Sequence, residues 1–483
     1  MTSAELDRAA AACLLASFPD RERPPEWIRR WLERGLGGVV LFAANTGDGL
    51  RELTAALRAE RPELLVATDE EGGDVTRLEA ARGSSYPGNL ALGAVDDTAL
   101  TREVAGAIAG DLARAGVTMN LAPVADTNTN PANPVIGVRS FGAEPELVAR
   151  HVAAFVEGTQ RLGVAACAKH FPGHGDTRAD SHLELPTVEA GPDELRSGAL
   201  VPFRAAIAAG VRAVMTGHLA VPALDSAPAT LSRAVVAGLL RGELGFDGLV
   251  VSDALDMRAV AGTTGVEDGA VRALAAGVDA LCLGPTLGPE AVERVHGAIV
   301  AAVRSERLAA DRLAEAASRV EETARWASAA GADGAPDRGA GSVAAARAVR
   351  ARGNVDAGAR PFVVELVPEP SIAAGAASYA IGDAVRTRRP GTRAVRLREP
   401  TADLRRLLRG AGDDRVVLVL RDATRHPWQQ AAARDLLAAR PDTVVVELGL
   451  PGRLPEGAAA SIETHGAGRV NLEAAAALLA PPA

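Results

Sequence analysis

Lysine is almost absent from this 483-residue chain. Lys169 is the only lysine, and every other fixed positive charge among the 52 Lys and Arg residues is an arginine. A lysine kept at one position of such a sequence indicates a need for a compact ammonium donor, which the planar fork of arginine does not replace. The alternative is a solvated lysine on the surface. We expect Lys169 to lie in a functional site.

Cysteine is also scarce. The three cysteines, Cys13, Cys167 and Cys282, are far apart and odd in number, which excludes a disulfide framework and a Cys-x-x-Cys metal site. The first residues lack the basic start and apolar run of a signal peptide, and no apolar stretch reaches about eighteen residues without charge or proline. The sequence therefore predicts a cytoplasmic protein with no membrane contact.

Excess positive charge is missing as well. A net charge of −9 gives no reason to expect nucleic acid or an anionic membrane surface as a partner. The composition, 48% apolar and 23% charged, is that of an ordinary globular protein. Because 483 residues exceed what one core usually holds, we expect two or three domains. The oligomeric state is left open.

One pattern repeats from the N-terminus to about residue 326: a short apolar run, a polar or glycine-bearing loop, and an alanine-rich helical stretch. The apolar runs are 13–18, 38–43, 64–69, 117–123, 165–169, 213–217, 249–253 and 279–284, and the helical stretches include 50–60, 96–115, 144–162, 193–209, 234–241 and 267–276. This alternation is typical of βαβ units and a parallel sheet. Eight runs predict a (β/α)₈ TIM-type barrel. Run 13–18 is the weakest, since it fits the end of the first helix equally well.

The pattern starts afresh after a stretch rich in Ala, Gly and Arg at 327–353, which reads as a linker containing a short helix. Three apolar runs then alternate with helical stretches: 361–367, 402–409, 415–421, 428–439 and 442–449. We therefore predict a catalytic barrel at 1–326, followed by a smaller three-layer α/β sandwich domain at 354–483.

Polar residues stand at or just after the carboxyl ends of the predicted barrel strands. They are Asp69, Asn120, Lys169 with His170, His218 and Asp253. Barrel enzymes build their active sites at this end, from several strands. Polar residues that merely begin loops would account for one or two of these positions but poorly for five. We expect an active site there.

Segment 169–182, KHFPGHGDTRADSH, concentrates chemically active residues. This segment is a poor candidate for a metal site, because Pro172 and two glycines prevent His170 and His174 from lying on one face of a helix. Asp180 and His182 remain potential ligands in an irregular loop. We expect no metal and no cofactor.

Acid–base catalysis is the second interpretation of this segment. Asp180 is close enough in sequence to hold one ring nitrogen of His182, leaving the other to exchange a proton with substrate. A purely structural His–Asp pair fits the spacing equally well. Asp253, directly after an apolar strand, suits a nucleophile or general base, and Asp256 remains an alternative to it.

Five stretches together resemble glycoside hydrolase family 3, in its NagZ-type β-N-acetylglucosaminidase branch. They are TDEEGGDVTR (68–77), NLAPVADTN (120–128), NPVIGVRSFG (133–142), KHFPGHGDTRADSH (169–182) and VVSDALDM (250–257). The similarity extends over the whole first domain, and the histidine segment is highly specific. THGAGRVNLEAAAALL (464–479) is similar to the end of two-domain members.

The resemblance implies a retaining β-N-acetylglucosaminidase acting on small β-linked N-acetylglucosaminides, such as the muropeptides of peptidoglycan recycling. It implies that Asp253 is the nucleophile and that His182 is the acid/base, with Asp180 as its partner. The implied substrate-binding residues are Asp69, Arg77, Arg139, Lys169 and His170.

Two alternatives stay open. A histidine in place of a second carboxylate tolerates an incoming phosphate, and some relatives are phosphorylases, so phosphorolysis of the same substrates is the first. A non-catalytic sugar-binding barrel is the second. The chain also departs from the family pattern: Asp74 stands where many members have arginine, Val138 stands where many have aspartate, and the second domain is short.

Overall fold

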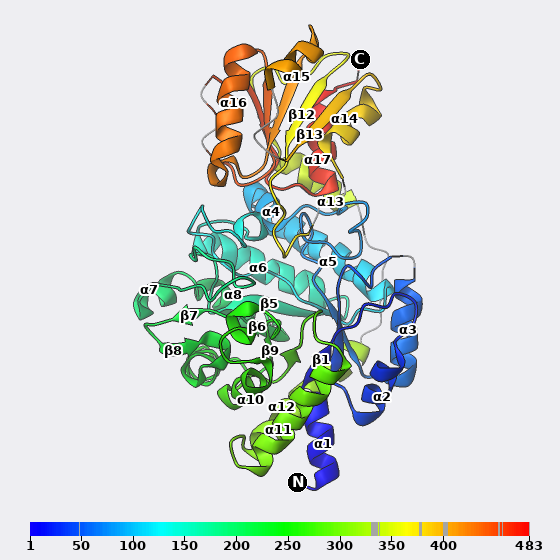
Figure 1. Cartoon of the computed structure of the whole chain (residues 1–483), viewed down its shortest axis with the longest axis vertical. Coiled ribbons are helices and arrows are strands. Elements are labelled where there is room, and N and C mark those ends of the chain that lie inside the picture. Colours follow the sequence, from blue (N-terminus) through cyan, green and yellow to red (C-terminus); the bar gives the residue numbers. More distant parts are fainter. Residues whose placement is uncertain are drawn as a thin grey trace. The chain divides into compact units, whose positions relative to one another are not determined.

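The chain forms two compact units. The computed structural model describes residues 1–47, 49–329, 337, 339–375, 379–398, 404–452, 455 and 457–482, without the side chains of 404–406. The first unit comprises Met1–Glu71, Thr101–Ile136 and Ala143–Asp337, and the second comprises Gly72–Leu100, Gly137–Gly142 and Arg338–Ala483 (Figure 1). Two segments from the N-terminal part of the sequence thus belong to the second unit.

The first unit contains an eight-stranded parallel sheet in the order β10-β1-β2-β3-β4-β5-β6-β9. The strands are β1 (Leu14–Ala16), β2 (Gly38–Leu41), β3 (Leu65–Thr68), β4 (Met119–Asn120), β5 (Ala165–Phe171), β6 (Ala213–Thr216), β9 (Leu249–Ser252) and β10 (Leu281–Cys282). A bridge between Val251 and Ala280 joins the two edge strands. The predicted barrel is confirmed, and each of the eight apolar runs, including the weakest, contains a strand.

Alternation of side chains along the strands separates the barrel interior from its helical coat. Interior residues such as Leu15, Val40, Met119, Cys167 and Val251 form one buried cluster. The helical elements of this unit are α1 (Ser3–Ala12), α2 (Glu26–Arg34), α3 (Leu50–Glu60), α5 (Thr98–Arg114), α6 (Pro145–Gln160), α7 (Pro192–Ser197), α8 (Val201–Ala208), η2 (Ala229–Leu231), η3 (Ala234–Glu243), α9 (Arg258–Ala261), α10 (Val266–Ala276), α11 (Pro289–Arg304) and α12 (Ala310–Ala329). A short hairpin pairs β7 (Ala220–Val221) with β8 (Asp225–Pro228).

The second unit is built on a six-stranded sheet in the order β11-β16-β15-β14-β12-β13. Its strands are β11 (Arg350–Arg352), β12 (Phe362–Leu366), β13 (Arg393–Leu397), β14 (Val416–Leu420), β15 (Val444–Glu447) and β16 (Ala460–Glu463). Its helical elements are α4 (Asn89–Val95), η1 (Gly137–Arg139), α13 (Gly339–Ala348), α14 (Ile381–Arg388), α15 (Leu404–Ala411), η4 (Ala423–Arg425), α16 (Pro427–Ala439) and α17 (Arg469–Leu479).

Helices cover both faces of this sheet, as Figure 1 shows. On one face Val363 and Val417 pack with Ile381 of α14 and Leu472 of α17. On the other face Val364 and Leu418 pack with residues of α16. The predicted three-layer α/β domain is therefore confirmed. Residues 330–336 and 338 of the predicted linker, and 402–403 of a predicted helix, lie outside the described residues.

Two details of the sequence prediction were wrong. The predicted helix 193–209 is split into α7 and α8, because the backbone leaves the helical conformation at Gly198. Strand β5 continues to Phe171, two residues beyond the predicted run 165–169, and the amide of Ala125 donates a hydrogen bond to the carbonyl of Lys169 at 2.6 Å. Within the described residues, we find no helix that combines the length and the apolar character needed to cross a membrane.

Candidate active site

The strands of the barrel place the predicted strand-end polar residues at one end of the sheet. Asp69 follows β3, Asn120 ends β4, and Asp253 follows β9 directly. His218 stands two residues after β6. Since all eight strands are parallel, their carboxyl ends lie at the same end of the barrel. The expected set of strand-end residues is thus brought to this end, with Lys169 and His170 lying inside β5 near its end.

Lys169 is buried between two carboxylates. Its Nζ atom lies 2.6 Å from Asp69 Oδ1 and 2.8 Å from Glu71 Oε1, and only 2% of the residue is exposed. Lys169 is therefore not a solvated surface lysine. The sequence prediction missed Glu71, although the acidic run at 69–71 held the signal. An ammonium donor fixed between two acceptors leaves Asp69, which is less buried than Glu71, available to a ligand.

Asp126 organises two histidines of the 169–182 segment. Its Oδ2 accepts a hydrogen bond from Nδ1 of His170 at 2.7 Å, and its Oδ1 accepts from the backbone amides of His170 at 3.1 Å and His174 at 2.7 Å. Because the N–H group at Nδ1 donates its hydrogen bond to this carboxylate, Nε2 of His170 is the nitrogen that can contact a substrate. Asp126 is fully buried. It was not among the predicted site residues, although it lies in the stretch 120–128.

His174 has a structural role in the same segment. Its Nδ1 lies 2.7 Å from the hydroxyl of Thr177, and its Nε2 lies 3.1 Å from the hydroxyl of Ser181. The amide of Asn133 donates to its backbone carbonyl at 2.8 Å. Both ring nitrogens are occupied, so His174 holds the loop that leads to Asp180 and His182.

Asp180 and His182 form the expected pair. Nδ1 of His182 lies 2.6 Å from Asp180 Oδ1, and the amide of His182 donates to the same oxygen at 2.9 Å. Burial acts to raise the pKa of Asp180, but the hydrogen bonds and charge of His182 outweigh it and hold the pKa below its ordinary value. An ionised carboxylate on Nδ1 leaves Nε2 of a partly exposed imidazole for proton exchange.

Three imidazoles act electrostatically on Asp253. Burial acts to raise its pKa, but the charges of His170, His218 and His182 and the amide of Ala254 together hold the pKa below its ordinary value. The Ala254 amide donates to Asp253 Oδ1 at 2.8 Å. The structure thus brings His182 and Asp253 within electrostatic range of each other. The carboxylate is kept ionised, which nucleophilic attack requires.

Two neighbours of Asp253 are already committed to other contacts. Nε2 of His218 lies 3.0 Å from the carbonyl of Ala254, and its Nδ1 lies 2.9 Å from the hydroxyl of Thr230. Asp256 accepts hydrogen bonds from the amide and hydroxyl of Thr286 at 3.0 and 2.6 Å. Asp253, in contrast, accepts only from its neighbouring amide among the described residues. This difference favours Asp253 over Asp256.

The remaining predicted substrate-binding residues belong to the second unit. Arg77 donates to the carbonyl of Ala373 at 2.9 Å. Arg139 is buried, and its carbonyl accepts from the side-chain amide of Asn89 at 2.7 Å. Val138 is partly buried. Asp74 forms an ion pair with Arg421.

Metal binding finds no support in the arrangement of side chains. Among the residues that the structure describes, no group of three or more His, Cys, Asp or Glu side chains is placed to hold a metal ion. The rings of His170 and His174 lie with their centroids 5.9 Å apart, and Asp126 binds both residues.

Comparison with known proteins gives the family. Residues 11–323 match the glycosyl hydrolase family 3 N-terminal domain. The chain belongs to glycosyl hydrolase family 3. The family predicted from the sequence motifs is therefore confirmed, and it is a family of glycoside hydrolases.

Individual family 3 relatives give the extent of the similarity. The chain is 37% identical over 280 residues to beta-hexosaminidase A of Pseudoalteromonas piscicida, an alignment that covers 53% of this chain and 47% of that protein. The chain thus spans about half the length of that relative. It is 40% identical over 253 residues to beta-hexosaminidase of Pseudomonas aeruginosa, covering 50% of this chain and 74% of that one.

A solved structure matches nearly the whole chain. The family 3 β-N-acetylglucosaminidase from Paenibacillus sp. str. FPU-7 is 32% identical, with a TM-score of 0.90, over 99% of this chain and 97% of that one. The fold therefore agrees with family 3 over both units, each taken by itself.

Proposed function

We propose that this protein is a retaining β-N-acetylglucosaminidase that releases terminal β-linked N-acetylglucosamine from small glycosides. The observation that carries the proposal is Asp253 at the end of β9, with its pKa held down by three imidazoles. The substrate class is supported by the relatives, which are named beta-hexosaminidases and a β-N-acetylglucosaminidase. Muropeptides, which contain this sugar, are the substrates we propose, in peptidoglycan recycling.

The reaction proceeds in two steps. The carboxylate of Asp253 attacks the anomeric carbon and forms a bond to it, while Nε2 of His182 gives a proton to the glycosidic oxygen as the bond to the aglycone breaks. His182 then takes a proton from water, whose oxygen bonds to the same carbon as the bond to Asp253 breaks, which restores the carboxylate and frees the sugar with its β configuration. Asp180 accepts from Nδ1 throughout and so fixes the nitrogen that exchanges the proton.

The sugar is held by the residues that the family motifs indicate. Asp69 accepts from sugar hydroxyl groups while Lys169 keeps it in place. Nε2 of His170 faces the sugar because Asp126 occupies Nδ1. Arg77 and Arg139 donate to hydroxyl or acetamido oxygens. No metal or cofactor takes part in this scheme.

Hydrolysis of p-nitrophenyl N-acetyl-β-glucosaminide tests the proposal. The wild-type chain should turn over this substrate, and Asp253→Ala should lower kcat by about 10⁴-fold or more, since a covalent nucleophile is removed. Asp256→Asn, on the same loop, is the matched control and should keep kcat within about tenfold of wild type. Wild-type turnover in Asp253→Ala would show that Asp253 is not the nucleophile.

A second function is favoured by the imidazole of His182. A phosphate ion approaching the glycosyl-enzyme is repelled less by an imidazole than by a second carboxylate, which suits a phosphorylase. Product analysis with and without phosphate separates the two functions. Hydrolysis predicts free N-acetylglucosamine at a phosphate-independent rate, and phosphorolysis predicts the 1-phosphate at an accelerated rate. Sugar binding with no turnover at all would indicate a non-catalytic barrel.

A further inference from the structure

His218 is a fully buried histidine two residues after β6, and the two-step reaction gives it no role. It lies within electrostatic range of Asp253, since the charge of each group shifts the pKa of the other. Its Nε2 lies 3.0 Å from the carbonyl of Ala254, and its Nδ1 lies 2.9 Å from the hydroxyl of Thr230. An imidazole in this position either exchanges protons or supports a neighbour, and its hydrogen bonds decide which.

The contact with Ala254 fixes the place of the hydrogen on this ring. A carbonyl oxygen only accepts, so the hydrogen lies on Nε2 of His218. Burial outweighs the charge of Asp253 and lowers the pKa of His218 below its ordinary value, so the ring is neutral near pH 7 and Nδ1 carries no hydrogen. Nδ1 therefore accepts from the hydroxyl of Thr230. Because both nitrogens are engaged, His218 has no proton to exchange with a substrate.

The hydroxyl of Thr230, in η2, connects this ring to β6. Its oxygen accepts from the hydroxyl of Thr216, the last residue of β6, at 3.0 Å. The carbonyl of Gly217, at 3.1 Å, competes with His218 for the single hydrogen of Thr230. If that carbonyl received it, His218 would need a hydrogen on each nitrogen and a buried positive charge, which the lowered pKa opposes. A chain of hydrogen bonds thus runs from Thr216 through Thr230 and His218 to Ala254.

Ala254, where the chain ends, sets the orientation of Asp253. Its amide donates to Asp253 Oδ1 at 2.8 Å, the one hydrogen bond to this carboxylate among the described residues, so Oδ2 keeps its lone pairs for attack. Its carbonyl accepts from the amide of Met257 at 3.1 Å and from Nε2 of His218. In the part of the chain that the structure describes, His218 is the only side chain that donates to this carbonyl.

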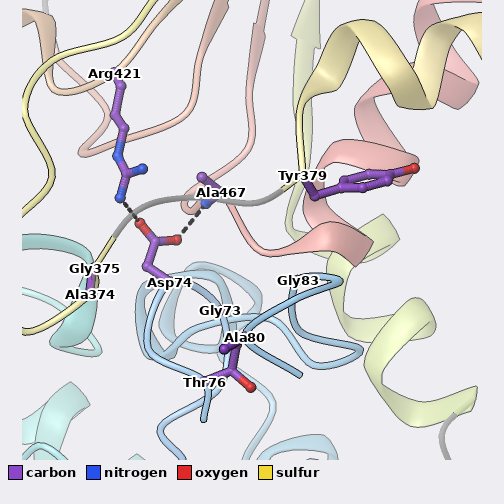
Figure 2. Close-up of a pocket in the computed structure, with 10 residues that line it drawn as sticks. All are labelled: Gly73, Asp74, Thr76, Ala80, Gly83, Ala374, Gly375, Tyr379, Arg421 and Ala467. Atoms are coloured by element: carbon purple, nitrogen blue, oxygen red, sulfur yellow. Dashed lines mark hydrogen bonds and ion pairs between the residues drawn. The ribbon is translucent and has the colours of Figure 1, made fainter. Parts of the chain in front are cut away.

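A comparison with the buried charged pair of the second unit shows what distinguishes His218. Asp74 pairs with Arg421 and accepts from the amide of Ala467 at 2.7 Å, as Figure 2 shows. The cavity beside this pair has a volume of about 50 Å³, far below the roughly 300–1,000 Å³ of small-molecule sites. The pair holds segments of its own unit together, whereas the chain through His218 ends at a carboxylate that is proposed to react.

We propose that His218 is a positioning residue for the nucleophile: its Nε2–H group holds the carbonyl of Ala254, and the amide of Ala254 then orients the carboxylate of Asp253. This inference rests on the proposed function, because it concerns the attack of Asp253 on the anomeric carbon. His218 itself contacts no sugar atom and exchanges no proton. A displacement of about 1 Å in a reacting group costs about 100-fold in rate, so loss of this support has a measurable effect.

The first turnover of a 2,4-dinitrophenyl N-acetyl-β-glucosaminide tests the proposal, because its leaving group needs no proton and its release reports attack by Asp253. His218→Leu makes no hydrogen bond, and the rate constant for this release should fall about 100-fold. His218→Gln offers an N–H group to Ala254 and a carbonyl to Thr230, and it should stay within about fivefold of the wild-type rate constant. The Kd for N-acetylglucosamine should be unchanged in both variants.

His151→Leu is the matched control. His151 on α6 is also fully buried, and its Nδ1 lies 2.8 Å from the hydroxyl of Thr101 on α5. The same change in this second histidine–threonine pair removes a similar contact in the helical coat of the barrel. It should leave the rate constant of the first turnover at the wild-type value.

Nitrogen-15 NMR of the histidine-labelled wild-type chain gives a readout that needs no turnover. The signals that disappear in His218→Gln belong to His218. At pH 7 they should show a hydrogen on Nε2 and none on Nδ1. A hydrogen on Nδ1 alone, or one on each nitrogen, would break the chain of hydrogen bonds and overturn the proposal.

Three kinetic results would also overturn it. Wild-type rates in His218→Leu would mean that Asp253 is oriented without His218. A loss in His218→Gln as large as that in His218→Leu would mean that the two hydrogen bonds are not what matters. An equal loss in His151→Leu would mean that the rate reports the packing of any buried histidine. No turnover by the wild-type chain would instead refute the proposed function, on which this inference rests.

Discussion

At the scale of single residues, the geometry around Lys169 explains why one lysine survives in an arginine-rich chain. Its ammonium group is 2.6 and 2.8 Å from carboxylates on the loop after β3. A guanidinium is wider and planar, and it cannot place a single nitrogen between two acceptors in the same buried space. Lys169 therefore sets the position of Asp69, the proposed acceptor for the sugar.

The Asp180–His182 pair leads to a prediction about leaving groups. Asp180→Asn removes the charge that stabilises protonated His182, so donation of the proton to the leaving group is weakened. We expect kcat/KM to fall about 100-fold for a glycoside with a sugar leaving group. It should change little for a 2,4-dinitrophenyl glycoside, whose leaving group needs no proton. Steady-state kinetics on both substrates measures the difference.

Equal losses on the two substrates would contradict this role and would indicate a structural pair. Asp176→Asn is the control in the same segment, since Asp176 accepts from the hydroxyl of Thr129 on the exposed surface. It should leave both rates unchanged.

Sequence motifs pointed to Asp253, Lys169 and the pair of His182 with Asp180, but not to Asp126 and Glu71, which contact residues of the predicted site. Asp253 directly follows β9, Lys169 lies near the end of β5, and His182 lies in the histidine-rich segment after β5, and each of these positions is visible in the sequence. Asp126 and Glu71 act through contacts with residues about 45 to 100 positions away, and single-sequence patterns carry no information on such pairs. The proposed roles of the site residues stay predictions.

At the scale of elements, the short connections between strands and helices decide the local chemistry. The loop after β16 shows this, because it contacts segment 72–74 through Ala467 and Gly468. His465 in this loop is buried, and its Nδ1 has no partner among the described residues. Burial and the charge of Arg350 lower the pKa of His465 to about 4.

This buried histidine predicts a loss of stability in acid. Above pH 6.5 His465 is neutral in both states. As the pH falls from 6.5 to about 4, His465 binds a proton in the unfolded chain but not in the folded chain. The free energy of unfolding therefore decreases by about 2–3 kcal/mol. His465→Asn, which tolerates the φ of +57° at this position, should remove that decrease.

Urea unfolding at pH 7 and pH 4.5 measures the effect. The difference between the two pH values should be smaller in His465→Asn than in wild type by about 2–3 kcal/mol. An unchanged difference would show that His465 is protonated as readily in the folded chain as in the unfolded one.

At the scale of the whole molecule, a group of ion pairs around Asp279 stabilises the end of the barrel opposite the strand-end polar residues. Asp279, two residues before β10, is fully buried and binds Arg241 at 2.6 Å and Arg319 at 3.3 Å, as well as Arg312. It also accepts from the amide of Val250 at 2.9 Å. Burial raises the pKa of Asp279 although the arginines act in the opposite direction. One carboxylate thus joins η3, β9 and α12.

Removing this carboxylate should destabilise the protein strongly. Asp279→Ala leaves three arginines without a common partner, and we expect the free energy of unfolding to fall by about 3–5 kcal/mol. Asp268→Ala breaks an exposed pair with Arg307 and should cost less than about 1 kcal/mol. Urea denaturation of the full chain compares them. Equal losses would contradict the role of Asp279.

The order of elements along the chain was predictable, but their grouping into units was not. Segments 72–100 and 137–142 belong to the second compact unit. Gly468 approaches Gly73 closely and Arg469 donates to the carbonyl of Gly83, while Asn89 donates to the carbonyl of Arg139. Patterns of hydrophobicity are local and do not reveal such contacts. The contiguous boundaries 1–326, 327–353 and 354–483 stay a prediction.

The stereochemistry of the first turnovers tests the central claim most directly. If Asp253 forms a bond to the anomeric carbon, two inversions give net retention. Proton NMR during hydrolysis of p-nitrophenyl N-acetyl-β-glucosaminide should then detect the β-anomer of N-acetylglucosamine first, with the α-anomer rising only by later mutarotation. Release of the α-anomer first would mean direct attack by water and would contradict a covalent role for Asp253.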